Sequence, residues 1–161
     1  MTGFAREKEM FPIVAEWLRA QGLLVRGETY THSGWADLAG CSFNPEMAAR
    51  RERRQRGWRP LHTRLVAVEL KLTRVAQALR QARAYRAHFP EVYVAFPAEV
   101  AESVRSSGRS LGHLGLLSVT PAECRVLVEA GEPHEGLTDW DMENQVNKFW
   151  RERRALGGSD E

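Results

Sequence analysis

Residues 65–72 constrain the fold most strongly, because they predict a β-strand that is covered on both sides. Side chains alternate between the two faces of a strand. Here both faces begin with apolar residues, Leu65 and Ala67 on one and Val66 and Val68 on the other. A strand of this kind belongs in the middle of a sheet with further layers packed against each face.

The remaining patterns predict helices and strands that alternate around this strand. Helices are expected at residues 6–21, from Thr73 as N-cap to about His88, at 98–106 and at 137–156; strands are expected at 23–25, 35–43, 92–96, 115–119 and, as a late strand at an edge, 125–129. This order favours an α/β sandwich with a mixed central sheet flanked by helices. A chain of 161 residues is long enough for one domain with its own core, so we expect a single domain over residues 1–161.

Residues 44–61 interrupt the pattern and are crowded with positive charge. The segment begins with Asn-Pro, ends with Arg-Pro, and carries these arginines: Arg50, Arg51, Arg53, Arg54, Arg56 and Arg59. We interpret it as a basic arm inserted between two strands. A second basic cluster lies near the end of the chain at Lys148, Arg151, Arg153 and Arg154. Such patches bind nucleic acid, although a solvated surface is the alternative for either patch alone.

The composition excludes several classes of function. No apolar run approaches the roughly 20 residues that span a bilayer, and the N-terminus lacks the apolar stretch of a signal peptide. We therefore expect a cytoplasmic protein with no membrane partner. Cys41 and Cys124 show no metal-ligand spacing and are expected to be reduced thiols. A glycine-rich phosphate loop is absent from the sequence, which argues against nucleotide hydrolysis.

Asp37, Glu69 and Lys71 form the candidate site. Glu69 and Lys71 project from the same face of their strand. The chain has only three lysines among its 23 basic residues, so a lysine here indicates a need for a compact ammonium group. If the strand of Asp37 pairs with that of Glu69, both carboxylates can converge on one cation. The alternative is a cross-strand ion pair or a solvated face, because Glu-x-Lys is a common pattern.

Two carboxylates, a backbone carbonyl and water form a ligand set that suits a hard cation such as Mg²⁺. Such an ion polarises a phosphate oxygen and lowers the pKa of an attacking water. An ammonium group beside it can steady the charge that develops on phosphorus. The pattern therefore points to metal-dependent phosphodiester hydrolysis.

Three segments of the chain resemble the PD-(D/E)XK nuclease superfamily: Trp35-Ala36-Asp37-Leu38-Ala39, Val68-Glu69-Leu70-Lys71 and Gln81-Ala82-Arg83-Ala84-Tyr85. The branch that they most resemble contains the Holliday-junction resolvases and the nuclease domains of helicase–nucleases. Glu9-Met10-Phe11-Pro12, with Gln21-Gly22 and Gly27-Glu28, is also similar to a bacterial PD-(D/E)XK family of unknown function. The resemblance covers residues 9–96. It implies a restriction-endonuclease-like αβββαβ core with a mixed four-stranded sheet, and Ala36 stands where the family pattern has proline.

The resemblance also implies roles for individual residues. Asp37 and Glu69 would be ligands of Mg²⁺ or Mn²⁺, the carbonyl group of Leu70 would complete the protein shell, and Lys71 would be the catalytic lysine. Glu9 would be an auxiliary acid that binds a second metal or orients a water. The alternative for Glu9 is a solvated carboxylate near the start of a helix.

Further residues are candidates for holding the site or for binding nucleic acid. Gln81 and Tyr85 lie four residues apart on one helix, and the related branch uses such a pair to hold the site and to contact nucleic acid. A polar stripe on an exposed helix face is the alternative. Arg74 on the same helix is a candidate phosphate contact. The arm residues Arg51, Arg53, Arg54 and Arg56 would grip nucleic acid beside the metal, or would dock a partner subunit.

The leading hypothesis is a Mg²⁺- or Mn²⁺-dependent endonuclease or exonuclease that hydrolyses phosphodiester bonds, with DNA as the favoured substrate. One alternative is a catalytically silent, nuclease-like module that binds DNA or a protein. Another is a structural or interaction protein in which the residue set is accidental. A homodimer is a further expectation, with Trp140, Phe149 and Trp150 either at its interface or covering the core.

Overall fold

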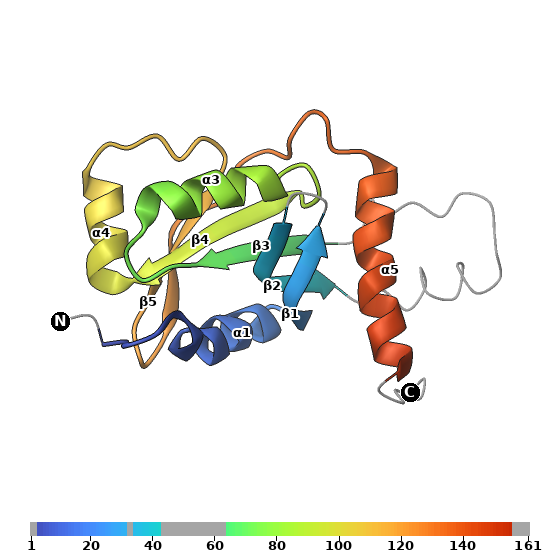
Figure 1. Ribbon diagram of the computed structural model, residues 1–161, viewed down its shortest axis with the longest axis horizontal. Coiled ribbons are helices and arrows are strands. Elements are labelled where there is room, and N and C mark those ends of the chain that lie inside the picture. The colour runs from blue at the N-terminus through green and yellow to red at the C-terminus, as the bar shows by residue number, and fades with distance from the viewer. Residues whose placement is uncertain (1–2, 32–33, 43–63, 156–161) are drawn as a thin grey trace.

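The computed structural model describes residues 3–31, 34–42 and 64–155 (Figure 1). The strands formed by these residues make one six-stranded sheet in the order β1-β2-β3-β4-β5-β6. Their bounds are β1 Leu23–Thr31, β2 Gly34–Ser42, β3 Leu65–Leu70, β4 Glu91–Pro97, β5 Gly115–Val119 and β6 Cys124–Val128. β3, β4 and β5 are parallel to one another, and the other pairings are antiparallel. The predicted mixed sheet is therefore confirmed.

Helices cover both faces of this sheet. They are the 3₁₀ turn η1 Glu7–Glu9 and the α-helices α1 Phe11–Ala20, α3 Val75–Tyr85, α4 Ala98–Ser106 and α5 Asp139–Ala155. One core cluster joins α1 to the sheet, and a second joins α3, α4 and α5 to the opposite face. Figure 1 shows α1 and α3 on opposite sides of the central strands. The α/β sandwich expected from the sequence is thus the observed architecture.

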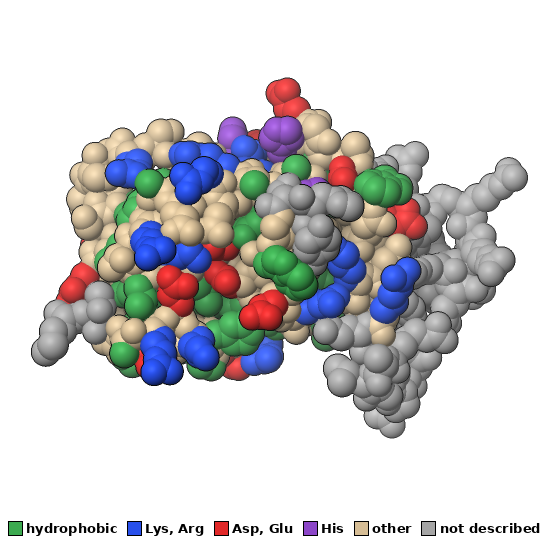
Figure 2. Space-filling view, in the orientation of Figure 1, with side chains coloured by type: hydrophobic (Ala, Val, Ile, Leu, Met, Phe, Trp, Pro, Cys, Tyr) green, Lys and Arg blue, Asp and Glu red, His purple; other side chains and the backbone are tan. Residues whose placement is uncertain are grey.

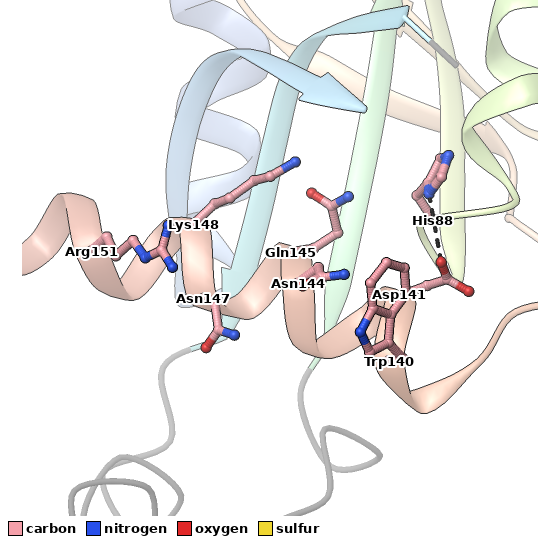
Figure 3. Close-up of a pocket in the computed structure, with 8 residues that line it drawn as sticks. All are labelled: His88, Trp140, Asp141, Asn144, Gln145, Asn147, Lys148 and Arg151. Atoms are coloured by element: carbon pink, nitrogen blue, oxygen red, sulfur yellow. Dashed lines mark ion pairs between the residues drawn. The ribbon is translucent and has the colours of Figure 1, made fainter. Parts of the chain in front are cut away.

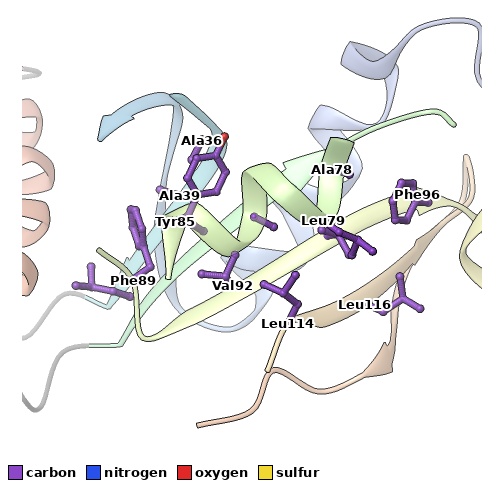
Figure 4. Packing of buried hydrophobic residues seen from close by; sticks show 14 of the residues in the cluster. Ala36, Ala39, Ala78, Leu79, Tyr85, Phe89, Val92, Phe96, Leu114 and Leu116 are labelled. Atoms are coloured by element: carbon purple, nitrogen blue, oxygen red, sulfur yellow. The ribbon is translucent and has the colours of Figure 1, made fainter. Parts of the chain in front are cut away.

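β3 is the buried central strand that its sequence predicted, and each of its six residues is buried. Val66 and Val68 pack in the α1-side core, while Leu65 and Ala67 pack in the α3-side core. Figure 4 shows the α3-side core, in which side chains of α3 pack against side chains that project from β4. The order α1-β1-β2-β3-α3-β4 follows the expected αβββαβ sequence of elements. β5 and β6, which the sequence also predicted, extend the sheet beyond the four strands that the resemblance implied.

Two boundaries near the N-terminus differ from the prediction. The helix expected at residues 6–21 is divided into η1 and α1, because Pro12 stands in the first turn of a new helix, where its missing N–H is not needed. β1 is longer than the strand expected at 23–25: it continues through Gly27, which pairs with Leu38, to Thr31. A Cβ atom at Gly27 would lie 2.8 Å from the ring of Phe11, so glycine provides room for close packing there.

The start of α3 also differs from the prediction. Thr73 does not cap the helix; Arg74 is the N-cap residue, and no side chain caps the helix with a hydrogen bond. β3 ends at Leu70 rather than at residue 72, although the backbone N–H of Lys71 still donates to the carbonyl oxygen of Ala95 at 3.1 Å. Lys71 therefore lies just beyond the strand, where β3 turns toward α3.

The C-terminal helix runs from Asp139 to Ala155, close to the expected span. Phe149 is buried in the α3-side core, whereas Trp140 is 62% exposed. Within the described ranges, none of the helices has the length and apolar character needed to cross a membrane. The basic arm at residues 44–61, with Arg51, Arg53, Arg54 and Arg56, lies outside the described residues.

Candidate active site

The pairing of β2 with β3 places Asp37 and Glu69 opposite each other. The last paired residues are Leu38 of β2 and Val68 of β3. Because the strands are antiparallel, the next position of this register places Asp37 of β2 opposite Glu69 of β3. Oδ2 of Asp37 accepts a hydrogen bond of 2.7 Å from the backbone N–H of Leu70. The two strands are thus adjacent, as the convergence of the two carboxylates requires.

The amine of Lys71 lies between several acceptors of this site. Nζ donates to Oε1 of Glu69 at 2.7 Å and to the carbonyl oxygen of Leu70 at 3.1 Å. It also lies 3.7 Å from Oε2 of Glu7. The ammonium group therefore contacts two of the three oxygen donors that the sequence assigned to a metal ion.

Glu69 is held by Tyr85 as well as by Lys71. The Glu69 side chain is 1% exposed, and its Oε2 accepts a hydrogen bond of 2.9 Å from the hydroxyl group of Tyr85. The same hydroxyl lies 2.5 Å from the carbonyl oxygen of Trp35 in β2. Tyr85 is buried, so it positions Glu69 and the start of β2 from inside the protein and does not present its side chain at the surface.

Burial and mutual repulsion shift the protonation of both carboxyl groups. Burial raises the pKa of Asp37, and the charges of Glu7 and Glu28 raise it further. The hydrogen bond from the Leu70 N–H and the charge of Lys71 lower it, but they do not cancel the rise. Burial raises the pKa of Glu69 as well, and the charge of Asp37 raises it further. Lys71 and the hydrogen bond from Tyr85 lower it, but the net direction is upward. The two negative charges are therefore unfavourable together, and binding of a proton or a cation would relieve them.

Lys71 keeps its proton in this environment. Burial acts to lower the pKa of its amine, but the hydrogen bond to Glu69 and the charges of Glu69, Asp37 and Glu7 together raise it above the ordinary value. The group is therefore an ammonium ion at neutral pH.

Glu7 and Glu28 are the two acids that the sequence reasoning did not place at this site. Both line a pocket of about 440 Å³ together with Asp37 and Leu70. Glu28 occupies the position of β1 that faces Asp37 in the strand register, between the pairs Gly27–Leu38 and Thr29–Ala36. Its φ of 45° is in the left-handed region, which a non-glycine residue seldom adopts. The Gly27-Glu28 pair in the sequence was the signal that could have located this acid.

Glu9 lies apart from these acids. Its side chain is exposed, and its Oε2 accepts the backbone N–H of Ala5 at 2.7 Å. The division between η1 and α1 changes which residue of the N-terminal segment faces the site. The structure consequently brings Glu7, rather than Glu9, next to Lys71.

Gln81 lies one turn before Tyr85 on α3 and has a buried oxygen without a partner. Its Oε1 has no hydrogen-bond donor within the described part of the chain. A buried amide oxygen of this kind is normally satisfied by water or by a ligand. Arg74 is the N-cap residue of α3, three residues after Lys71, and it is exposed.

The donors at this site fit a hard divalent cation. Carboxylate and carbonyl oxygens from Asp37, Glu69 and Leu70 are the kind of ligand that Mg²⁺ accepts, and Mg²⁺ keeps several waters when only one or two carboxylates bind it. Over residues 3–31, 34–42 and 64–155, no group of three or more His, Cys, Asp or Glu side chains is placed to hold a metal ion. Any ion here would depend on the Leu70 carbonyl and on water for its remaining ligands.

The surface around the site carries both signs of charge. Arg6 and Lys8 line the same pocket as Asp37 and Glu7. Figure 2 shows Asp and Glu side chains gathered on the face between α3 and α1, with Lys and Arg side chains beside them. An acidic centre with basic side chains at its rim can hold a cation inside and attract an anion from outside.

Comparison with known proteins identifies a shared fold and no function. No protein-family model matches the chain, and no curated protein is similar enough in sequence to match it. Among solved structures, the chain is similar to SPO1766, a protein of unknown function from Silicibacter pomeroyi. The TM-score is 0.66 at 17% sequence identity, and the match covers 95% of this chain and 89% of the other. At this identity the likeness shows the fold alone.

Proposed function

We propose that this chain is a metal-dependent nuclease of the PD-(D/E)XK type, which hydrolyses phosphodiester bonds in DNA with Mg²⁺ or Mn²⁺. One observation carries the proposal. Asp37 and Glu69 come from adjacent strands to opposite positions, and the amine of Lys71 lies 2.7 Å from the Glu69 carboxylate. A buried carboxylate beside a half-buried one and a protonated amine is a costly arrangement that a purely structural strand end does not need.

Three oxygen donors would hold the metal ion: Asp37 Oδ1, Glu69 Oε1 and the Leu70 carbonyl. Among the described residues, the only hydrogen bond to the Asp37 carboxylate is made at Oδ2, so Oδ1 is open to a ligand. When bound, the ion supplies Lewis acidity toward a phosphate oxygen and a lower pKa for a bound water.

Lys71 acts in this proposal as a fixed positive charge. Because its pKa is raised, it remains an ammonium ion at neutral pH and serves poorly as a general base. Its role is to stabilise the negative charge that develops on the phosphate oxygens. Tyr85 keeps the Glu69 carboxylate in one orientation through its 2.9 Å hydrogen bond. Gln81, with an unpartnered amide oxygen on the same helix, is available to orient a water.

Nucleic acid as the substrate is supported by the charges near the site. Arg6 and Lys8 line its pocket, and Arg74 is exposed at the start of α3. These side chains would attract the phosphate backbone without reading sequence. The arginines of the arm at residues 44–61 would extend the same attraction. The choice of DNA over RNA follows from the resemblance to the resolvase and helicase–nuclease branch.

A second candidate function is a catalytically silent module that binds DNA or a protein. It is favoured by the internal hydrogen bonding of the site. Both oxygens of Glu69 already accept hydrogen bonds, and the Leu70 carbonyl accepts one from Lys71. A site that satisfies its own polar groups is stable without a cation.

We further propose a cytoplasmic location, supported by the free thiols of Cys41 and Cys124. A homodimer is proposed as well; Trp140 is exposed on α5, so it does not cover the core. Phe149 is unavailable for this contact, because its side chain is buried in the core.

Cleavage of supercoiled plasmid and of end-labelled single- and double-stranded DNA tests the nuclease proposal. Wild type is expected to cleave in Mn²⁺ or Mg²⁺ and to be inactive in EDTA. Lys71→Ala should lower the rate by at least about 100-fold. Lys8→Ala is the matched control, because it removes the same charge from an exposed position of the same pocket and should change the rate only a few-fold. Metal-independent DNA binding without any cleavage by wild type would favour the silent module.

A further inference from the structure

A second pocket lies along α5 and is separate from the carboxylate site. Its volume is about 380 Å³, and it shares no lining residue with the pocket that contains Asp37. Six of its lining residues come from α5 in addition to Asp141: Trp140, Asn144, Gln145, Asn147, Lys148 and Arg151. Asp141 and His88 complete the described lining, and Figure 3 shows these two side chains in contact beside Trp140.

The sequence of α5 separates an apolar face from the residues that line the pocket. Met142 and Phe149 are buried in the α3-side core, and Val146 packs against it. The spacing of these three residues, i, i+4 and i+7, defines the stripe that anchors the helix. The pocket residues occupy the remaining helix surface, so packing against the core does not explain their side chains.

Two amide oxygens in the pocket lack hydrogen-bond donors. The Gln145 side chain belongs to a residue that is only 3% exposed, and its Oε1 is buried without a partner among the described residues. Oδ1 of Asn147 also lacks a partner among the described residues, but Figure 3 shows this side chain on the other side of α5 from Gln145. An unsatisfied buried acceptor destabilises the folded protein, so a ligand that brings N–H donors would be favoured here.

The charge of the pocket favours an anion. Lys148 and Arg151 both line it, and Arg26 of β1 adds positive potential near Lys148. Burial lowers the pKa of the Lys148 amine, and the charge of Arg26 lowers it further. Asp141, which lies 4.0 Å from His88, is the acidic residue among the described lining.

An aromatic ring lies exposed at the same place. Trp140 is 62% exposed, whereas most of the large apolar side chains of the described residues are buried. An exposed indole ring beside basic side chains provides a surface on which a nucleobase can stack. The lining thus combines a stacking surface, an amide acceptor and two cations.

We propose that this pocket binds one nucleotide unit, with its base against Trp140, an N–H group of the base donating to Gln145, and its phosphate near Lys148 and Arg151. A pocket of about 380 Å³ is of the size that holds small ligands. Amide groups and aromatic rings are the side chains that recognise unpaired bases, so a base explains the lining better than an acidic peptide does. The proposal goes beyond the nuclease activity, because it requires none of the residues of the carboxylate site.

Calorimetric titration of the full chain in EDTA tests the proposal without any cleavage. The probes are AMP, CMP, GMP and UMP, a 12-nucleotide single-stranded DNA, ribose 5-phosphate and poly-glutamate. Trp140→Ala and Gln145→Met should each weaken nucleotide binding at least tenfold, and Arg151→Ala should weaken binding of the phosphorylated probes. Trp35→Ala and Arg105→Ala are the matched controls, since they remove an exposed indole and an exposed guanidinium group elsewhere and should leave binding unchanged.

Gln145→Met separates ligand binding from folding. Methionine keeps the length of the side chain and removes the unsatisfied amide, so this variant should unfold at the same or a higher temperature while binding the nucleotide less tightly. Binding that is the same in wild type and in Lys71→Ala would separate this pocket from the proposed catalysis.

Each result decides between sources of the ligand or overturns the proposal. Binding of mononucleotides would identify a free nucleotide as sufficient, and binding of the oligonucleotide alone would identify a single strand; both support the pocket if Trp140→Ala weakens them. Equal affinity for ribose 5-phosphate and AMP, stronger binding of poly-glutamate than of the oligonucleotide, or no binding by any probe would overturn it.

Discussion

The hydroxyl group of Tyr85 lies 2.9 Å from Oε2 of Glu69 and thereby connects α3 to the end of β3. Both side chains are buried. Burial raises the pKa of Tyr85, and the charge of Glu69 raises it further, so the hydroxyl stays protonated and donates. The acid in the candidate site is therefore oriented by a donor that comes from the helix packed against its strand.

Replacing Tyr85 with phenylalanine should destabilise the protein by about 1–2 kcal/mol, because the single hydroxyl proton that lies between Glu69 Oε2 and the Trp35 carbonyl oxygen is lost. For a chain of this length, each kcal/mol lowers the melting temperature by about 2–4 °C. Tyr93→Phe is the control, since the Tyr93 hydroxyl donates to the less buried Glu129 and its loss should cost less. Equal melting temperatures for wild type and Tyr85→Phe would contradict the role given to this hydroxyl group.

Asp37→Asn should stabilise the folded protein near neutral pH. The pKa of Asp37 is higher in the folded than in the unfolded state, so the folded state binds more protons between the two values. The free energy of unfolding of wild type therefore decreases as the pH rises through that interval and stays lower above it. Asparagine carries no charge and still accepts the Leu70 N–H, so the variant should melt a few degrees higher at pH 7.5.

This advantage should shrink as the pH falls toward the ordinary pKa of aspartate, because wild-type Asp37 is then protonated as well. Thermal unfolding of both proteins from pH 4 to pH 8 measures the difference. A difference that is constant across this range would show that the charge of Asp37 is not its cause.

Glu7 and Glu28 should contribute to cation affinity, and Glu9 should not. Glu7 lies 3.7 Å from the Lys71 amine, and Glu28 lines the pocket that contains Asp37, so neutralising either should weaken Mn²⁺ binding about 3- to 10-fold through the lost attraction. Glu9→Gln removes an equal charge from an exposed side chain that bonds its own segment. Calorimetric titration with Mn²⁺ compares the three variants. If Glu9→Gln weakens binding most, the placement of Glu7 at the site is wrong.

At Glu28, a glycine variant should be at least as stable as an alanine variant, which reverses the usual order of stability within a strand. Its φ of 45° costs a residue with a Cβ atom about 1–2 kcal/mol, and glycine avoids that cost. Glu28→Gly should therefore be at least as stable as Glu28→Ala in denaturant unfolding. At Arg26 in the same strand, which has no such backbone angle among the described positive-φ residues, glycine should be less stable than alanine by about 0.5–1 kcal/mol. The same order at both positions would exclude backbone strain at Glu28.

Much of the fold could be predicted from the sequence, because its strongest signals are local. Helix α4 and strand β5 have the predicted bounds, where Pro97 and Gly115 mark their starts. The central position of β3 followed from its apolar residues on both faces. Strand β1 was predicted too short, because Gly27 is a typical end signal, and only the packing of the Phe11 ring explains a glycine inside the strand.

The candidate site could be predicted in part. The alternation of β3 and the order of the strands were enough to place Asp37, Glu69 and Lys71 near one another. The auxiliary acid could not be chosen from the sequence, because a 3₁₀ turn in place of a continuous helix brings Glu7 toward Lys71. The α5 pocket also depends on tertiary packing, since the unpartnered oxygen of Gln145 becomes visible only when the helix is docked on the sheet.

The double contact of the Lys71 amine, with Glu69 and with the Leu70 carbonyl, has a consequence for regulation. The amine already satisfies these two oxygens with a positive charge. In the proposed enzyme, a metal ion would compete with the amine for them, so occupancy of the site would depend on the free metal concentration.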